Sequence, residues 1–269
     1  MSDRPIVLQE LEYTDQKIKV LTEKLLDVCS SFNITLTSRQ AQDCLMHLLY
    51  VEQVNSYINL TRITDLDEAI ILHLLDSLVL ARYFDSSDLN YLDMGTGAGF
   101  PGIPLAIATG ATGTLIDSVG KKINAVNAII QKLQLDRATA VHTRIEEYAI
   151  QNKGCFDIVV ARALASMPIL IEYATPFLRE RGRLIISKGN PEDNELVSAQ
   201  QAASICGLTL VRTDSFDLPF DLGHREIFLF ERVSKPSISL PRQNGMARKN
   251  PLHNVSRETI KRDRFSSLI

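Results

Sequence analysis

From Tyr91 onward, short apolar runs alternate with segments long enough to form helices. This alternation is typical of a mostly parallel sheet covered by helices on both faces. Only Ser215 to Arg225 separates the last two apolar runs, which is too little for a helical crossover, so we expect the final strand to insert antiparallel. The expected strands lie near 91–94, 113–117, 139–142, 156–161, 183–187, 208–214 and 226–231, and the expected helices include 103–109, 120–134, 168–178 and 191–206. The sequence thus predicts an α/β fold with a Rossmann-like seven-stranded sheet.

The N-terminal third has the periodicity of amphipathic helices. Apolar residues recur at helical spacing from Leu21 to Phe32, a capping-box pattern at 37–40 precedes a second helix, and Asp65 with Glu68 indicates the start of a third. We therefore expect three parts, which are a helical N-terminal cap packed on the core (1–85), a Rossmann-like domain (86–233) and a C-terminal tail (234–269).

The tail is basic, although the whole chain has a formal net charge of -3. From Arg232 to Ile269 there are nine of the 29 basic residues and only two of the 32 acidic ones. A basic segment on an acidic body favours contact with a polyanion, although a solvated tail without a partner would have the same charge. Pro, Ser and basic residues dominate after Val233, so we expect an extended or disordered tail unless it docks on something.

Composition sets further limits on the kind of protein. Met1 to Gln16 have neither a basic start nor a long apolar stretch, and charged residues interrupt the most apolar helical region, so we expect a cytoplasmic protein without a membrane span. The four cysteines lie far apart, with no Cys-x-x-Cys pair and no nearby histidine cluster. Neither a disulfide framework nor a metal site is therefore expected.

A glycine-dense turn at 95–102 follows the first expected strand and precedes a helix. Glycines let the backbone take positive φ and approach a ligand closely. Gly95, Gly97 and Gly99 form Gly-x-Gly-x-Gly, and Phe100 stands where a dinucleotide-binding Gly-x-Gly-x-x-Gly needs its third glycine. The spacing favours S-adenosylmethionine over a nicotinamide cofactor.

Asp117 ends the second expected strand, and Ser118 follows it. A carboxylate at this place can accept both hydroxyls of a ribose. Asp117 could instead cap the helix that starts near Gly120. The glycine turn in front of it favours ribose binding.

Four more candidate residues follow three later strands at the same expected sheet edge. Ile145 and Glu146 could present a backbone amide and a carboxylate to an adenine, or simply open a helix. Arg162 could meet a carboxylate or a phosphate, although an arginine is by default a surface residue. Lys188 could bind an RNA phosphate or remain solvated.

Six motifs together resemble the RsmG (GidB) family, over roughly residues 20 to 252. They are Asn59-Leu60-Thr61, His73-Leu74-Leu75-Asp76-Ser77, the stretch from Asp93 to Leu105 with Gly102-Ile103-Pro104 after the glycine turn, Asp117-Ser118 followed by Lys121-Lys122, Arg144-Ile145-Glu146-Glu147, and Arg162-Ala163-Leu164-Ala165.

The resemblance implies an enzyme that uses S-adenosylmethionine to methylate N7 of one guanine in small-subunit ribosomal RNA. Matching the family position by position implies cofactor contacts at Gly95, Phe100, Ile145, Glu146 and Arg162. The segment 240–252 is similar to the basic extension of longer members, so we expect RNA contacts there. The RNA-binding candidates are Arg242, Arg248 and Lys249, with Lys188 added from its place after a strand.

The chain also departs from the family pattern. Many members have Trp-Asn where this chain has Val54-Asn55, and it contains no Trp at all. The target base could stack on an aromatic ring or an arginine plane. Phe100, Tyr57 and Arg62 are candidates, although each has an ordinary role in the core or at the surface.

Chemistry at guanine N7 requires no catalytic acid or base, because its lone pair is free at neutral pH. We expect a monomer that needs no metal and acts on small-subunit ribosomal RNA or the 30S subunit. A methyltransferase for a protein or small molecule would lack salt-dependent RNA affinity, and a non-catalytic RNA-binding assembly factor would fail to bind S-adenosylmethionine. Truncation after Val233 is expected to weaken RNA binding and to leave cofactor affinity unchanged.

Overall fold

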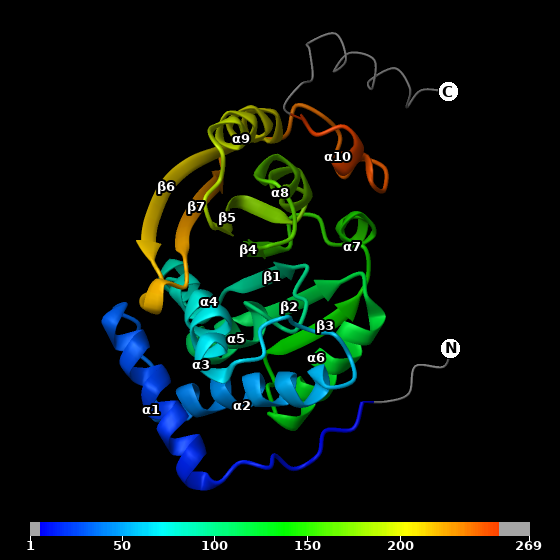
Figure 1. Ribbon diagram of the computed structural model, residues 1–269. Coiled ribbons are helices and arrows are strands. Elements are labelled where there is room, and N and C mark those ends of the chain that lie inside the picture. The colour runs from blue at the N-terminus through cyan, green and yellow to red at the C-terminus, as the bar shows by residue number, and fades with distance from the viewer. Residues whose placement is uncertain (1–5, 253–269) are drawn as a thin grey trace. The chain divides into compact units, whose positions relative to one another are not determined.

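The computed structural model describes residues 6–252 (Figure 1). Seven strands form a sheet in the order β3-β2-β1-β4-β5-β7-β6. They are β1 (Asn90–Met94), β2 (Thr112–Asp117), β3 (Ala138–His142), β4 (Phe156–Arg162), β5 (Leu178–Lys188), β6 (Leu208–Asp217) and β7 (His224–Arg232). Each predicted strand is present, although β5 begins earlier, at Leu178. β7 pairs antiparallel with β5, with Leu229 opposite Ile185, so the predicted fold is confirmed.

The chain divides into two compact units. Unit 1 extends to Thr143 and also contains Asp217–Gly223. Unit 2 extends from Arg144 to Phe216 and resumes at His224. The N-terminal helices and β1 to β3 therefore belong to unit 1, and β4, β5 and β7 to unit 2. The predicted boundaries near residues 85 and 233 stay a prediction.

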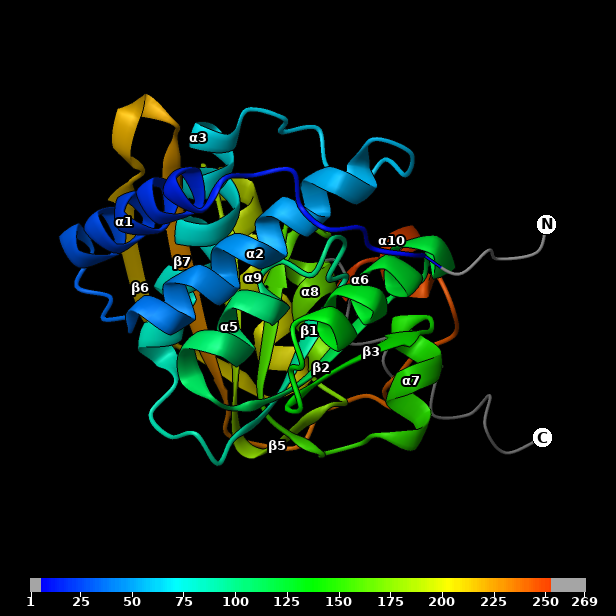
Figure 2. The same ribbon diagram turned by 90° about the horizontal axis from the view of Figure 1, so that it is seen from below.

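Two long helices open unit 1, α1 (Asp15–Ser31) and α2 (Ser38–Asn55). Thr37 and Gln40 form the predicted capping box at the start of α2. Figure 2 shows α2 beside α5 (Gly102–Thr109) and α6 (Gly120–Lys132), the helices that follow β1 and β2. α2 buries an apolar face with Cys44, Leu45, Leu48, Leu49 and Val51. Tertiary packing of such an apolar face supplies most of the stability of a helix in a folded protein.

The predicted third helix is irregular. It begins as α3 (Leu66–Ala69) at the predicted cap, since Asp65 Oδ1 accepts a hydrogen bond from Glu68 N at 2.9 Å. It continues as the π-helical η1 (Ile70–Leu75), then α4 (Asp76–Leu78) and the 3-10 turn η2 (Val79–Tyr83). Stretches of π-helix are rare in proteins, and those that occur often lie at functional sites. This one holds His73, which faces the loop described below.

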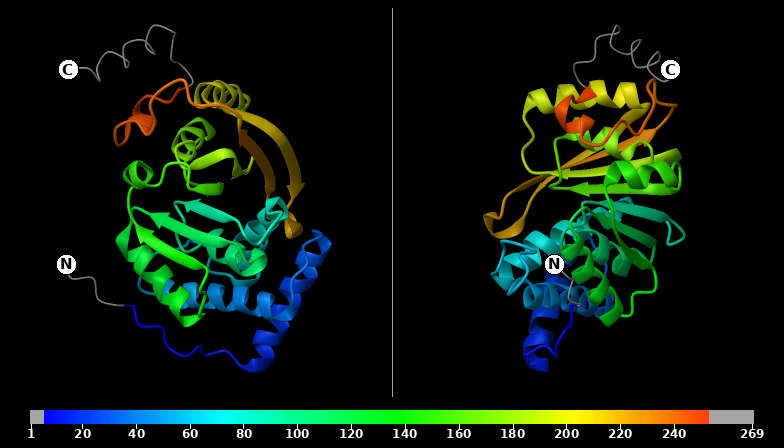
Figure 3. Two further views of the ribbon diagram at one scale, coloured as in Figure 1. Left: turned by 180° about the vertical axis from the view of Figure 1, so that it is seen from behind. Right: turned by 90° about the vertical axis from the view of Figure 1, so that its right-hand side faces the viewer.

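Unit 2 contains α7 (Ile145–Gln151), α8 (Met167–Ala174) and α9 (Asp193–Cys206). α8 packs on α9 and on β5. In Figure 3, β6 and β7 form a long curved pair of strands. Among residues 6–252, no helix is both long and apolar enough to cross a membrane.

The C-terminal segment, which we define as residues 240–252, differs from the expected extended or disordered tail. It contains the short helix α10 (Met246–Lys249), and it buries Leu240, Ala247 and Leu252. These apolar side chains give the segment a packed face within unit 2, which the basic composition concealed. Residues 253–269 of the predicted tail lie outside the described residues.

Candidate active site

The glycine loop, residues 95–101, connects β1 to α5. Gly95, Gly97 and Gly99 have φ values of 73°, 59° and 92°, a region that glycine adopts without strain. A Cβ added to Gly97 would meet nothing within 4 Å. One added to Gly99 would lie 2.9 Å from His47 Nε2. The loop is therefore open at Gly97 and tightly packed at Gly99.

The start of α5 is fixed to the sheet by buried polar contacts. Asp93, which is 1% exposed, accepts a hydrogen bond from Gly102 N at 2.9 Å. Tyr91 donates its hydroxyl proton to Gly102 O at 2.6 Å. A Cβ on Gly102 would lie 2.5 Å from Leu115 Cγ, so only glycine fits between α5 and the two strands.

Asp117 uses both carboxylate oxygens on nearby backbone. Oδ2 accepts from Gly97 N at 3.0 Å, and Oδ1 accepts from Val119 N at 2.8 Å. The N-cap of α6 is Val119, and Asp117 does not cap the helix through its side chain. A carboxylate has about four lone-pair positions, so two remain for other donors. Asp117 thus ties β2 to the glycine loop, and ribose binding stays a prediction. Ser118 is exposed and its carbonyl pairs with His142 Nε2 at 3.1 Å.

Two buried histidines support the glycine loop. His47 Nε2 donates to Ala98 O at 2.9 Å, and His73 Nε2 lies 2.8 Å from Thr61 Oγ1. Phe100 packs between them, stacked on His73 with ring centroids 4.6 Å apart and tilted to His47 at 4.4 Å. The Phe100 ring is 6% exposed, so it serves the core of unit 1, and a contact from Phe100 to a cofactor or base stays a prediction.

Burial lowers the pKa of His47 to about 4, although its bond to Ala98 O opposes that shift. The ring is therefore neutral at pH 7, and the wall behind the glycine loop carries no charge from it. Nothing in the sequence indicates this role of His47, because one histidine within an apolar helix carries no sign of the residue that it contacts.

Ile145, Glu146 and Arg162 lie in unit 2. Ile145 and Glu146 form the first turn of α7, after the N-cap residue Arg144. Glu146 Oε1 accepts a hydrogen bond from Gly245 N in the C-terminal segment at 2.8 Å. Arg162 is the last residue of β4 and pairs in register with Ser187 of β5. Their contacts with a cofactor stay predictions.

The four candidate RNA-binding side chains have different surroundings. Lys188 Nζ lies 2.8 Å from Glu195 Oε1, and its side chain is only 20% exposed. Arg242 is bound to Glu172. Arg248 and Lys249 are exposed on α10, although Arg248 Nη2 also donates to Leu164 O at 3.3 Å. Lys188 and Arg242 thus have structural partners, which leaves Arg248 and Lys249 as the more accessible pair.

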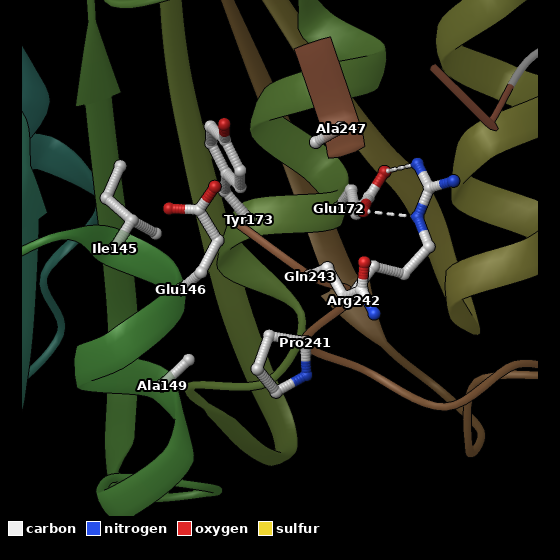
Figure 4. A pocket seen from close by; sticks show the side chains of 9 residues that line it. All are labelled: Ile145, Glu146, Ala149, Glu172, Tyr173, Pro241, Arg242, Gln243 and Ala247. Carbon is white, nitrogen blue, oxygen red and sulfur yellow. Dashed lines mark hydrogen bonds and ion pairs between the residues drawn. The ribbon is translucent and has the colours of Figure 1, made fainter. Parts of the chain in front are cut away.

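A small pocket in unit 2 lies between the C-terminal segment and helices α7 and α8 (Figure 4). Its lining is Ile145, Glu146, Ala149, Glu172, Tyr173, Pro241, Arg242, Gln243 and Ala247. Nothing in the sequence pointed to Glu172 and Tyr173, which lie within the apolar helix α8. Among residues 6–252, no three His, Cys, Asp or Glu side chains are grouped to hold a metal ion.

Comparison with solved structures agrees with this architecture. A geranyl diphosphate methyltransferase in complex with SAM matches with a TM-score of 0.50 at 12% identity, over 62% of this chain and 90% of that one. The sheet order and the glycine loop after β1 define the fold of the class I S-adenosylmethionine-dependent methyltransferases.

Sequence comparison identifies the family. The model of the GidB family, described as rRNA small subunit methyltransferase G, matches residues 40–225. A relative named ribosomal RNA small subunit methyltransferase G from Acetivibrio thermocellus is 33% identical over 88% of this chain and 99% of its own length. Another with that name, from Lactobacillus helveticus, is 34% identical over 86% of this chain and 98% of its own. The chain belongs to this family.

Proposed function

We propose that the protein transfers the methyl group of S-adenosylmethionine to N7 of a specific guanine in 16S ribosomal RNA. The observation that carries the proposal is the glycine loop, open at Gly97 and tied to Asp117, in a chain that belongs to the GidB family. The relatives' names supply the substrate class, and N7 is the position that the family resemblance implies.

The residues of the glycine loop fit the cofactor. The three glycines have positive φ and no Cβ, so no side chain of theirs blocks the turn. The hydroxyl of Thr96 is buried without a hydrogen-bond partner among the described residues. In unit 1, Gly95, Gly97, Gly99 and Asp117 would hold the cofactor, with Asp117 at the ribose. Phe100 and Ser118 adjoin these contacts. In unit 2, the proposed contacts are Ile145, Glu146 and Arg162.

Methyl transfer to N7 depends on the positioning of the two reactants and needs no proton transfer. S-adenosylmethionine supplies a methyl group on a positively charged sulfur. The N7 lone pair would bond to the methyl carbon while the carbon–sulfur bond breaks, so the positive charge would move to the purine and no proton would have to be released. The side chains then contribute by orienting the two reactants. We expect kcat to be flat between about pH 6.5 and pH 9, whereas an essential group titrating near neutrality would contradict this mechanism.

The proposed partner is small-subunit ribosomal RNA, as free RNA or in the 30S subunit, with the protein acting as a cytoplasmic monomer. Arg248 and Lys249 place two exposed cations on α10, where they can approach phosphates. Arg242 and Lys188 were also candidates, but their ion pairs with Glu172 and Glu195 make direct contact less accessible.

The decisive experiment is methyl transfer from labelled S-adenosylmethionine to 30S subunits and naked 16S RNA from a strain that lacks the endogenous enzyme. Label on one guanine N7 is the expected result, with subunits from the parent strain as the control because their site is already methylated. Cofactor binding without transfer to any form of the RNA would refute the proposal. The search would then move to a protein or small-molecule acceptor.

A further inference from the structure

The C-terminal segment is anchored in unit 2 by a buried bidentate ion pair. Arg242 Nε donates to Glu172 Oε1 at 2.7 Å, and Nη2 donates to Oε2 at 2.5 Å (Figure 4). The two side chains are only 13% and 4% exposed. Arg242 Nη2 also donates to Asn250 O at 2.8 Å, so one guanidinium binds both α8 and the far end of the segment. Loss of either partner would leave a buried charge without compensation, which is strongly unfavourable.

The same segment fixes the side chains that begin α7. Gly245 N donates to Glu146 Oε1, and Asn244 Nδ2 donates to Glu147 Oε1, both at 2.8 Å. Gly245 has a φ of 78°, which lets its amide take this position. Glu146 also lies against Tyr173 of α8, whose pKa is raised by burial and by the charge of Glu146. Its carboxylate is therefore held from two sides.

A further contact reaches the loop after β4. Arg248 Nη2 donates to Leu164 O at 3.3 Å. Leu164 lies two positions after Arg162, beyond Ala163, which has a positive φ of 52°. The segment thus touches both parts of unit 2 in which a cofactor contact is predicted, the start of α7 and the end of β4.

We propose that the C-terminal segment is a positioning element for the cofactor contacts of unit 2, with Arg242 as the positioning residue that anchors it. This inference rests on the proposed function. Glu146 is the residue through which Arg242 acts, because seating the segment places Gly245 N on its carboxylate. Arg248 and Lys249 lie on the same segment, so RNA that binds them and a cofactor that binds α7 affect each other's affinity reciprocally.

The proposal reverses one expectation from the sequence. Truncation after Val233 was expected to leave cofactor affinity unchanged, on the view that the tail only contacts RNA. The contacts with Glu146 and Leu164 instead favour loss of cofactor affinity. Truncation after Leu252 keeps every contact described here and is the matched control.

The test compares Arg242→Ala, Arg242→Lys and Arg212→Ala with the full chain. Arg212 forms an ion pair with Asp214 on β6, so its variant controls for loss of an arginine pair elsewhere. In calorimetry with S-adenosylmethionine, Arg242→Ala should raise Kd at least roughly tenfold, in the range of typical coupling between sites. Arg242→Lys should recover part of that loss, and Arg212→Ala should bind as the full chain does.

Steady-state kinetics distinguish positioning from loss of folded protein. Arg242→Ala should raise KM for the cofactor and leave kcat nearly unchanged when both cofactor and RNA are saturating, whereas a smaller folded fraction would lower kcat and leave KM unchanged. Failure of the full chain to bind S-adenosylmethionine would overturn the proposed function, and this role with it. Binding by the full chain that Arg242→Ala retains undiminished would overturn the positioning role alone.

Hydrogen exchange of the full chain covers the case in which Arg242→Ala does not fold. Adding S-adenosylhomocysteine should slow amide exchange in 241–250 together with α7, and β6 is the internal control. Protection of the glycine loop without any change in 241–250 would overturn the proposal.

Discussion

Acidification should destabilise unit 1 through His47. Burial lowers the pKa of His47 to about 4 from its ordinary value of 6.5. Above pH 6.5 the ring is neutral in both the folded and the unfolded chain, so it has no effect on stability. As the pH falls below 6.5, His47 is protonated in the unfolded chain but stays neutral in the folded chain. The folded state therefore loses stability until the pH reaches about 4.

The size of the effect follows from the shift. At 1.36 kcal/mol per pKa unit, the full loss is about 3 kcal/mol, and about 2 kcal/mol of it falls between pH 7 and pH 5. Since domains are typically stable by about 5 to 15 kcal/mol, this loss should be readily measured. Because His47 Nε2 donates to Ala98 O, the destabilisation should reach the glycine loop.

The assay is urea unfolding at pH 7 and pH 5 for the native protein and for His47→Gln. Glutamine can donate to the Ala98 carbonyl but takes up no proton, so it serves as the matched variant. The native protein should lose about 2 kcal/mol more than His47→Gln across this range. Equal losses for the two proteins would refute the conclusion that His47 is buried and neutral.

Three further outcomes follow from the site. Asp117→Ala should weaken cofactor binding by roughly tenfold to a hundredfold, the usual cost of charge-assisted hydrogen bonds, and unchanged affinity in calorimetry would contradict the ribose role. Gly102→Ala should lower the free energy of unfolding by about 1 to 3 kcal/mol through overpacking. Gly189→Ala is the control and should change it much less, because its Cβ would meet only an ordinary contact at 3.9 Å. Equal effects of the two substitutions would argue against the steric explanation. The double variant Arg248→Ala/Lys249→Ala should reduce the salt slope of RNA binding by about 1.4 if both contact phosphates of single-stranded RNA, and an unaltered slope would exclude those contacts.

The sequence predicted the sheet because each strand carries its own signal. Apolar runs such as Phe156–Ala161 and the short connection before β7 depend on nearby residues alone, and they sufficed to predict seven strands with the last one antiparallel. The glycine turn is likewise a local signal, because closely spaced glycines indicate a backbone with positive φ, which the structure has. The assignment of cofactor contacts from these signals stays a prediction.

The contacts missed by the sequence analysis join positions far apart in the chain. Arg242 and Glu172 are separated by 70 positions. The residues around either one do not indicate its partner, so the basic composition of the tail did not predict a buried ion pair. The π-helical turn around His73 and the reach of His47 to Ala98 also arise only when α2, η1 and the glycine loop are packed together. Periodicity cannot supply such information.

The late position of Arg242 also has a consequence for synthesis. Domains form progressively as the nascent chain leaves the ribosome, and Glu172 emerges well before its partner. Nascent chains arrested before residue 242 should therefore have a loosely packed α8, detectable as faster proteolysis than in chains arrested after full emergence of the C-terminal segment. The ion pair that anchors the C-terminal segment would then form only after α8 has already left the ribosome.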